Sequence, residues 1–313
     1  MSLQKYLQKL THLRTDRSRG IAPHKPVLLL AVIDNIERGT ITNNRISITP
    51  ELVATFMEIW TTLVKEGPFE PRFALPFFHL KSEGFWQLVP FPNMAPGVTS
   101  SGSIRSFTNL KETIAWAEIE LELFDLMIQP VSCEALRRAL LDTYFPLTKS
   151  NYRHYQVHEG QYLQQLEQEV LENTTGSYTN IVAEEEVLFL RGSAFRKVVP
   201  RAYGFTCAIS GMRIIAAEIS MVDACHIVPF YISHNDTIEN GIALCPNLHR
   251  AFDRHLISIN DDYRVLLKTE FAEATESDYG IKKYEGCQLL LPTEQKYRPS
   301  KANLAWHREY RGL

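Results

Sequence analysis

The sequence predicts an α+β protein of two domains: a mostly helical N-terminal domain with a small sheet, and a C-terminal domain in which short strands precede one short helix. The first half holds apolar runs of helical length. A polar stretch at 149–182 separates them from short segments that suit hairpins. We therefore expect domains at 1–150 and 187–313, joined by a helical, polar linker at 151–186.

Length and composition bound the class of protein. A chain of 313 residues is long enough for two cores, and 45% hydrophobic with 22% charged residues is ordinary for a globular protein. The net charge of -3 excludes a histone-like protein that binds nucleic acid through bulk positive charge. It leaves room for a local basic surface, because attraction depends on where charges lie.

Targeting and redox signals are weak. The N-terminal segment lacks the apolar core of a signal peptide, and no apolar run approaches the roughly 18 residues of a membrane span. Five scattered cysteines, an odd number, favour reduced thiols over a disulfide framework. We expect a cytoplasmic protein without a membrane segment.

In the N-terminal domain the strongest predictions are two helices. The run at 25–38 is too apolar for a surface helix and too long for a strand, so we expect a buried helix that ends at Gly39. A short strand at 46–48 follows, and Thr49 then caps a helix that begins with Pro50. One face of that helix carries Leu52, Val53, Phe56, Ile59, Trp60 and Leu63.

The rest of this domain is less periodic. An aromatic stretch broken by prolines leads to a strand at 85–89. Helices are expected at 109–128 and at 133–144, the second opened by Ser132 and stopped at Pro146.

The most informative segment of the C-terminal domain is 222–259, which follows an expected helix at 193–203. A strand is expected at 223–227, and a loop then leads to an Asn-Gly turn and a short apolar run. A short helix at 247–254 carries a His and an Asp four residues apart.

Four polar residues of this segment suit phosphodiester hydrolysis. The imidazole of His226 has the intrinsic pKa needed to deprotonate water near neutral pH. His249 and Asp253 project from one helix face and can hold a divalent ion, which neutralises the charge that builds on the phosphate. The Asn240 amide both donates and accepts, which suits it to fix the loop that orients His226.

Each of these residues also has a plainer interpretation. A single His is most often structural or at the surface, and a His/Asp pair at this spacing is commonly a helix surface pair. The joint pattern is more specific, because a polar strand end, an Asn-Gly turn and such a helix face rarely coincide without a shared site.

The same segment resembles a known family. Residues from about 193 to 270 resemble the HNH, or ββα-metal, endonucleases of bacterial restriction enzymes, through CAISG at 207–211, DACHIVP at 223–229, NGIALCPNLHRAFDRHLISI at 240–259 and RPSKANLAWHRE at 298–309. The resemblance implies a ββα-metal fold, with His226 as general base and Asn240 orienting the loop. It also implies that His249 and Asp253 hold Mg²⁺ or Mn²⁺, and that DNA is the partner.

Two departures from the family matter. Many relatives carry a metal-binding carboxylate or histidine directly before the base, where this chain has Cys225. Asp223, on the same strand face, is the candidate that supplies this ligand instead. Other relatives hold a structural zinc on two CxxC pairs, but each pair has lost its second cysteine here, which leaves Cys207 and Cys245. Since structural zinc prefers four ligands, we expect no structural zinc and two cysteines that pack as small apolar residues.

Target choice is expected to reside in the N-terminal domain, because so compact a nuclease contacts few base edges. The candidate surface is 72–86, where apolar side chains lie beside basic ones, as at nucleic-acid interfaces. Aromatic residues with this spacing are also typical of a core. For Phe77 and Trp86, burial is at least as well supported as exposure.

A second resemblance covers 22–90 and continues to SIRSF at 103–107. This part resembles the sulfur-binding domains of modification-dependent HNH restriction enzymes, which recognise phosphorothioate DNA. A backbone sulfur is larger and less hydrated than oxygen, so a small apolar pocket favours it. The resemblance implies that Leu75, Pro76 and His79 line that pocket. The candidates for phosphate or base contacts are His24, Lys25, Arg72 and Arg105.

Together these features predict a type IV-like, modification-dependent restriction endonuclease, in which Arg250 or Arg254 braces a phosphate. Cutting both strands with one active site per chain suggests a homodimer. Two alternatives stay open. One is an HNH endonuclease that reads unmodified sequence or a methylated base. The other is a non-catalytic DNA-binding protein with a degenerate HNH fold, which only Cys225 favours.

Overall fold

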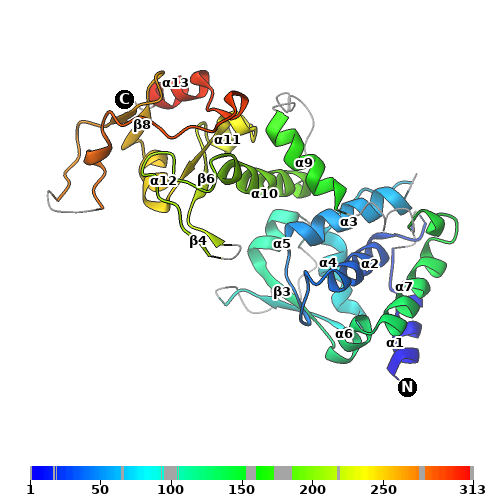
Figure 1. Ribbon diagram of the computed structural model, residues 1–313. Coiled ribbons are helices and arrows are strands. Elements are labelled where there is room, and N and C mark those ends of the chain that lie inside the picture. The colour runs from blue at the N-terminus through cyan, green and yellow to red at the C-terminus, as the bar shows by residue number, and fades with distance from the viewer. Residues whose placement is uncertain are drawn as a thin grey trace. The chain divides into compact units, whose positions relative to one another are not determined.

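The computed structural model describes the whole chain except residues 1, 17, 19, 65–66, 93, 95–103, 105, 153–159, 173–184, 217–218, 275–278 and 311–313. The chain divides into two compact units, which Figure 1 shows. Unit 1 comprises Met1–Leu163 and Glu184–Leu190, and unit 2 comprises Gln164–Ala183 and Arg191–Leu313. The predicted linker at 151–186 takes in segments of both units, and its part at 173–184 lies outside the described residues.

Unit 1 is mostly helical, with one small sheet. Its helices are α1 (Ser2–Thr11), α2 (His24–Glu37), α3 (Pro50–Leu63), α4 (Ala74–His79), η1 (Leu80–Glu83), α5 (Phe107–Thr113), α6 (Leu121–Ile128) and α7 (Pro130–Tyr144). The sheet is antiparallel, with β3 (Ile114–Ile119) between β1 (Arg45–Ile46) and β2 (Trp86–Pro90). Two further helices, α9 (Gln161–Glu172) and α10 (Glu185–Ala202), begin in unit 1 and end in unit 2.

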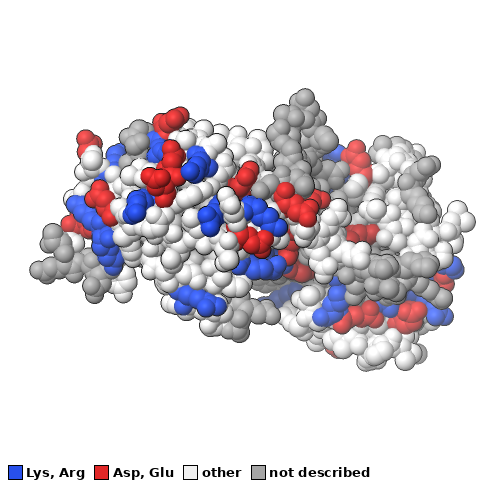
Figure 2. All heavy atoms as spheres, turned by 45° about the horizontal axis from the view of Figure 1, so that its top comes forward, with Lys and Arg blue, Asp and Glu red and all other residues white. Residues whose placement is uncertain are grey.

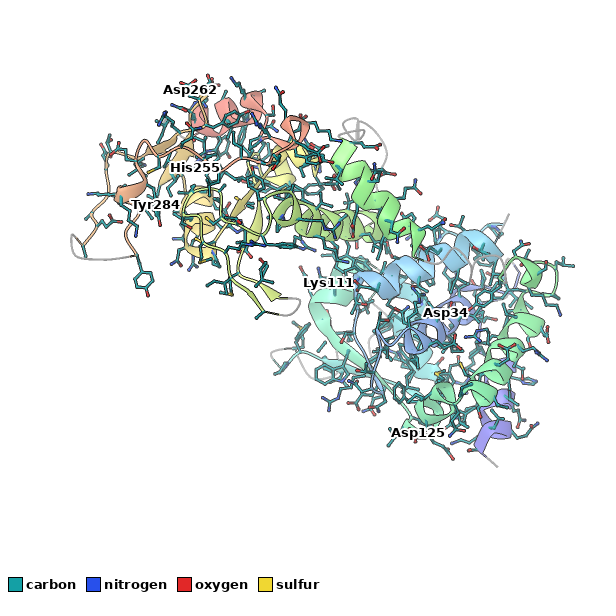
Figure 3. The ribbon with its side chains drawn as sticks, in the orientation of Figure 1. Asp34, Lys111, Asp125, His255, Asp262 and Tyr284 are labelled. Atoms are coloured by element: carbon teal, nitrogen blue, oxygen red, sulfur yellow. The ribbon has the colours of Figure 1, made fainter. Side chains whose placement is uncertain are left out.

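Helix α2 is the centre of unit 1. It packs against α3, α4, α6 and α7, and nearly all of its side chains are buried, as the apolar run predicts. The chain leaves the helix at Gly39, whose φ of 73° is accessible to glycine at no steric cost. Asp34 points from α2 into this interior (Figure 3), where it accepts a hydrogen bond of 2.6 Å from the Tyr152 hydroxyl.

Helix α3 begins as the sequence predicts. The Thr49 side chain accepts a hydrogen bond from the Leu52 amide at 3.2 Å, and Pro50 occupies the first helical position. All six residues of its predicted apolar face are buried. Phe77 and Trp86 are also core residues, and the Trp86 indole N–H donates to the Phe77 carbonyl at 2.9 Å.

The helix predicted at 109–128 is wrong. The structure has α5, then the central strand β3, then α6 in this region. The segment IAWAEI of β3 contains helix-forming Ala and Glu, but it pairs with β1 and β2 on its two sides, and tertiary pairing overrides local preference. The expected start of the next helix at Ser132 is also wrong, because Pro130 stands at its first position.

Unit 2 is built from short strand pairs and helices. Its strand pairs are β4 (Ile215–Ala216) with β5 (Ile219–Ser220), β6 (Asp223–His226) with β7 (Gly241–Leu244), and β8 (Ile257–Ile259) with β9 (Val265–Leu267). Its helices, besides its parts of α9 and α10, are α11 (Phe230–Ser233), η2 (Ile238–Asn240), α12 (Pro246–Asp253), η3 (Lys282–Tyr284), η4 (Gln295–Tyr297) and α13 (Lys301–Glu309). Helix α10 begins eight residues before the helix predicted at 193–203.

Helix α13 packs against the C-terminal end of α12 and holds it in place. The His307 imidazole stacks on Phe252 with ring centroids 3.8 Å apart, and its Nδ1 lies 2.8 Å from the Ser258 hydroxyl. Its Nε2 lies 3.2 Å from the Phe252 carbonyl oxygen, so the neutral ring donates there and accepts from Ser258. His255, labelled in Figure 3, stacks on the other side of His307 with centroids 4.5 Å apart. These contacts hold the chain just beyond α12.

The surface carries charges of both signs, as the small net charge of -3 leads one to expect. Acidic and basic side chains are interspersed over the face in Figure 2. Among the described residues, no helix has the length and apolar character that crossing a bilayer requires.

A candidate metal centre and a separate pocket

The candidate site in unit 2 is formed by the β6–β7 hairpin and α12. In the hairpin, Cys225 pairs with Ile242 and His226 with Gly241, and every residue of β7 is buried. Helix α12 packs against both strands and starts with Pro246 at its first position. Because side chains alternate along a strand, Asp223 and Cys225 of β6 share one face.

His249 lies between two carboxylates. Its Nδ1 is 3.3 Å from Oδ2 of Asp223, and its Nε2 is 3.5 Å from Oδ2 of Asp253. The Cys225 sulfur is 3.7 Å from Oδ1 of Asp253. The structure thus brings Asp223, His249 and Asp253 together, and it adds Cys225 to them.

Three of these groups lie close enough together to share one metal ion. One ligand atom each of Cys225, His249 and Asp253 can be chosen so that all lie within 4.8 Å of one another. Zinc-type ions bind sulfur at about 2.3 Å and nitrogen or oxygen at about 2.0–2.2 Å, so donors with this spacing fit around one ion. A thiol, an imidazole and a carboxylate are all established ligand types. The residues present therefore fit a divalent metal ion.

The surroundings of Cys225 oppose its ionisation while the protein is metal-free. Burial raises the pKa of the Cys225 thiol well above its ordinary value, and the carboxylates of Asp253 and Asp223 raise it further. A cation among these groups acts in the opposite sense, because a metal ion deprotonates a thiol that coordinates it.

His226 is half-buried and packs face to face on Phe195 of α10, with ring centroids 3.9 Å apart and the planes 8° from parallel. Its Nε2 is buried and has no hydrogen-bond partner among the residues that the structure describes. Burial, followed by the charges of Arg196 and His249, lowers the pKa of His226 to about 4. The ring is therefore neutral at pH 7 and can accept a proton.

Asn240 links both ends of the segment between β6 and β7 through its side-chain hydrogen bonds. It is fully buried, its Oδ1 accepts from the Val228 amide at 2.9 Å, and its Nδ2 donates to the carbonyls of Val228 at 3.0 Å and Asn235 at 2.8 Å. Val228 follows His226 by two residues. The same loop is anchored by Asp236, which accepts from the buried Arg191 guanidinium at 3.1 Å.

Two neighbours of His226, Phe195 and Arg196, could not be predicted from the sequence around it. Both residues belong to α10, about thirty residues upstream, and no pattern in the segment 222–259 predicts that they contact His226. The one available signal was Gly241. A Cβ there would lie 2.5 Å from a Val199 methyl and 3.1 Å from the Phe195 ring, so the hairpin needs glycine to approach α10.

Cys207 and Cys245 contact each other, whereas the sequence suggested only apolar packing. The Ser210 hydroxyl lies 3.9 Å from the Cys245 sulfur, and the Ser210 amide donates to the Cys207 sulfur at 3.5 Å. The contact with Cys245 lowers the pKa of the Cys207 thiol. These two thiols form a pair that is separate from the group of Cys225, His249 and Asp253, called the Cys225 group below.

Unit 1 contains a separate cavity of about 410 Å³. Its lining residues are Arg14, Thr15, Asp16, Ala22, His24, Lys25, Phe69, Leu75, Pro76, His79 and Ser82. Five of the seven residues predicted from sequence to contact DNA therefore surround one pocket. Arg72 is exposed and makes an ion pair of 2.8 Å with Glu70, and Arg105 lies outside the described residues.

Two of the predicted basic contacts are engaged within the protein. Lys25 is buried, forms an ion pair with Glu83 and donates to the Arg14 carbonyl at 2.7 Å. The Nε2 of His24 lies 2.8 Å from the Glu70 carbonyl oxygen, to which it donates, and burial lowers the pKa of the ring. The pocket wall is therefore less positively charged than its residue types suggest.

Two segments of the chain match known families. Residues 207–260 match the family described as "HNH endonuclease", and residues 3–151 match the family described as "ScoMcrA-like, DNA sulfur-binding domain". The chain combines an HNH endonuclease domain with a DNA sulfur-binding domain. The HNH match contains the whole Cys225 group with His226 and Asn240, and the sulfur-binding match contains the pocket.

One solved structure similar to this chain is described as "Modification dependent TagI restriction endonuclease". Its sequence identity is 20% and its TM-score 0.28, over 42% of this chain and 39% of that one. The chain thus spans about two fifths of that protein's length. Comparison with curated proteins finds no match.

Proposed function

We propose that this chain is a modification-dependent restriction endonuclease, in which the pocket of unit 1 recognises phosphorothioate DNA and the HNH domain hydrolyses phosphodiester bonds. One observation carries the proposal. A group of side chains that can bind a metal ion is adjacent in sequence to a neutral imidazole, on which the charge of His249 acts, inside the segment that matches the HNH endonucleases.

His226 is the proposed general base. Its ring is neutral at pH 7, and its buried Nε2 leaves Nδ1 as the atom that takes a proton from the attacking water. Stacking on Phe195 holds the plane of the ring, and the Asn240 hydrogen bonds hold the chain that follows it. Arg196, whose charge acts on His226, is exposed and suited to bind a phosphate oxygen.

The proposed metal site is built on His249 and Asp253. A divalent ion bound there supplies positive charge to the scissile phosphate and to the leaving oxygen. The sequence suggests Mg²⁺ or Mn²⁺, which favour oxygen ligands. The third ligand, Asp223 or Cys225, decides how well these two ions fit the site.

The cavity of unit 1 suits a phosphate in which sulfur replaces one oxygen. Leu75 and Pro76 give it an apolar side, which favours the less hydrated sulfur. The neutral His24 and the compensated charge of Lys25 avoid a strong preference for an ordinary phosphate. The pocket would then distinguish phosphorothioate from ordinary phosphate by the sulfur atom rather than by net charge.

Assembly and location follow from the proposed activity. One active site per chain cuts both strands most simply as a homodimer, which light scattering of the DNA complex would detect. We also propose that the protein acts in the cytoplasm, where a restriction endonuclease meets its DNA.

The proposed function can be tested with two DNA duplexes that are identical except that sulfur replaces one backbone phosphate oxygen in one of them. We expect wild-type protein with a divalent ion to bind and cut the phosphorothioate duplex at least tenfold better than the matched unmodified one, and EDTA to abolish cutting. Equal binding of both duplexes would remove the sulfur proposal. Cutting that persists in EDTA would remove the metal-dependent mechanism.

A further inference from the structure

We infer that Cys225 is the third protein ligand of the metal ion, that Asp223 orients His249 from outside the coordination sphere, and that the centre prefers zinc-type ions to Mg²⁺. This inference rests on the proposed nuclease function, since it concerns the same centre. It assigns a thiolate where the sequence suggests a carboxylate.

The position of Cys225 supports its role as a ligand. It is the strand residue directly before His226, it is fully buried, and its sulfur points at the carboxylate of Asp253 at 3.7 Å. Its sulfur and one ligand atom each of His249 and Asp253 lie within 4.8 Å of one another, and Asp223 is not part of this group. An ion that Asp253 and His249 share therefore lies within reach of the sulfur.

The two nitrogens of His249 separate the roles of the two carboxylates. Nε2 faces Asp253, so it is the nitrogen that shares an ion with that carboxylate. Nδ1 then carries the proton and donates to Asp223 at 3.3 Å. Metal-binding histidines commonly donate their second N–H to a carboxylate, which fixes the ring and strengthens its basicity. Asp223 fits that positioning role.

The exposure of the group leaves room for water and substrate. The side chain of Asp253 is 57% exposed and that of His249 26% exposed, while the Cys225 sulfur lies beneath them. Three protein ligands with open positions on one side are the arrangement of catalytic rather than structural zinc sites. The ion would be held from the protein side and reached from the solvent side.

Ligand chemistry sets the metal preference. Thiolate and imidazole favour borderline and soft ions, whereas Mg²⁺ requires oxygen ligands and retains its water. On binding, the Cys225 S–H bond breaks, its electron pair goes to the metal and its proton goes to solvent. One thiolate and one carboxylate then balance a 2+ charge, so Zn²⁺ or Co²⁺ fits this set better than Mg²⁺.

Cobalt tests the assignment without an activity assay, because a thiolate ligand gives Co²⁺ an intense near-ultraviolet charge-transfer band. We expect the band when Co²⁺ is added to chelator-treated full-length protein, and its loss in Cys225→Ser. Cys245→Ser is the matched control, because it removes a thiol of the separate Cys207 pair, and it should keep the band. Asp223→Asn should also keep it, with Co²⁺ bound about 10–100-fold more weakly.

Several outcomes would overturn the inference. These are a wild-type protein that binds Co²⁺ without the band, a band that survives Cys225→Ser, and a band that Cys245→Ser removes. Displacement of bound Co²⁺ by an equal concentration of Mg²⁺ would overturn the metal preference. If Cys225→Ser does not fold, X-ray absorption of Zn²⁺ in the Cys245→Ser protein decides instead. One sulfur at about 2.3 Å is expected, and a shell of nitrogen and oxygen alone contradicts it.

The failure of this inference differs from that of the proposed function. DNA cutting with Mg²⁺ by a protein that lacks the thiolate band removes the Cys225 assignment and leaves the nuclease. A folded protein that shows the band but cuts no DNA with any divalent ion removes the nuclease and leaves the metal site.

Discussion

Replacing Asn240 by alanine tests how the loop after His226 is held. The change deletes three hydrogen bonds of 2.8–3.0 Å and leaves the buried Val228 amide without an acceptor. The Val228 carbonyl keeps the Ser233 hydroxyl at 3.3 Å, so the main losses are one N–H and the Asn235 carbonyl. An unsatisfied buried group costs about 1–3 kcal/mol, which gives a loss of about 3 kcal/mol in the free energy of unfolding.

Urea denaturation measures this loss, and hydrogen exchange of peptides covering 222–230 locates it. Asn303→Ala is the matched control, because it removes a single bond of 3.3 Å from a half-buried position of α13, where alanine favours the helix, and the Glu239 carbonyl that loses this bond keeps the Ser300 amide as a donor. We expect the control to unfold within about 0.5 kcal/mol of wild type. If Asn240→Ala unfolds at the same urea concentration as the control, with unchanged exchange at 222–230, the positioning role assigned to Asn240 is refuted.

Three further predictions concern packing, pH and recognition. Gly241→Ala should cost about 1–3 kcal/mol of stability and slow DNA cutting, because its Cβ would overlap a Val199 methyl; equal melting temperatures in calorimetry would contradict this. His307 has a pKa lowered from 6.5 to about 4, so unfolded chains take up its proton first and stability falls as pH drops through that range. The loss is at most about 3 kcal/mol, and the stability advantage of wild type over His307→Gln should shrink between pH 7 and pH 4.5; a constant difference in urea titrations would refute the buried neutral ring. Leu75→Asp should weaken binding of phosphorothioate DNA at least tenfold and leave Co²⁺ binding unchanged; undiminished binding in a gel-shift titration would exclude the pocket.

Local signals in the sequence were sufficient for some elements and not for others. Helix α3 could be predicted because Thr49, Pro50 and the apolar spacing all favour the same start and the same buried face. Strand β3 could not, because Ala and Glu favour a helix and only its partners, Arg45–Ile46 and Trp86–Pro90, make it a strand. Those partners are up to 73 residues away, as in the pairing of Arg45 with Glu118, and no local pattern encodes the pairing.

The candidate site divides in the same way. The spacing of His249 and Asp253 predicts one shared helix face, and the structure has them 3.5 Å apart. A cysteine on a strand resembles any small apolar residue, so its contact with Asp253 needs the packing of α12 on β6 to be known. Likewise, Lys25 resembles an exposed cation at a helix start, and only the fold shows that Glu83 neutralises it.

The most direct test of the account is the rate at which His226→Ala cuts phosphorothioate DNA under conditions where it binds that DNA as tightly as wild type. Removing a general base slows hydrolysis by about 10²–10⁴-fold, and we predict a loss in that range with Co²⁺ or Zn²⁺ bound at unchanged affinity. If this variant cuts at the wild-type rate, the proposed mechanism is wrong, because His226 then does not act as the general base.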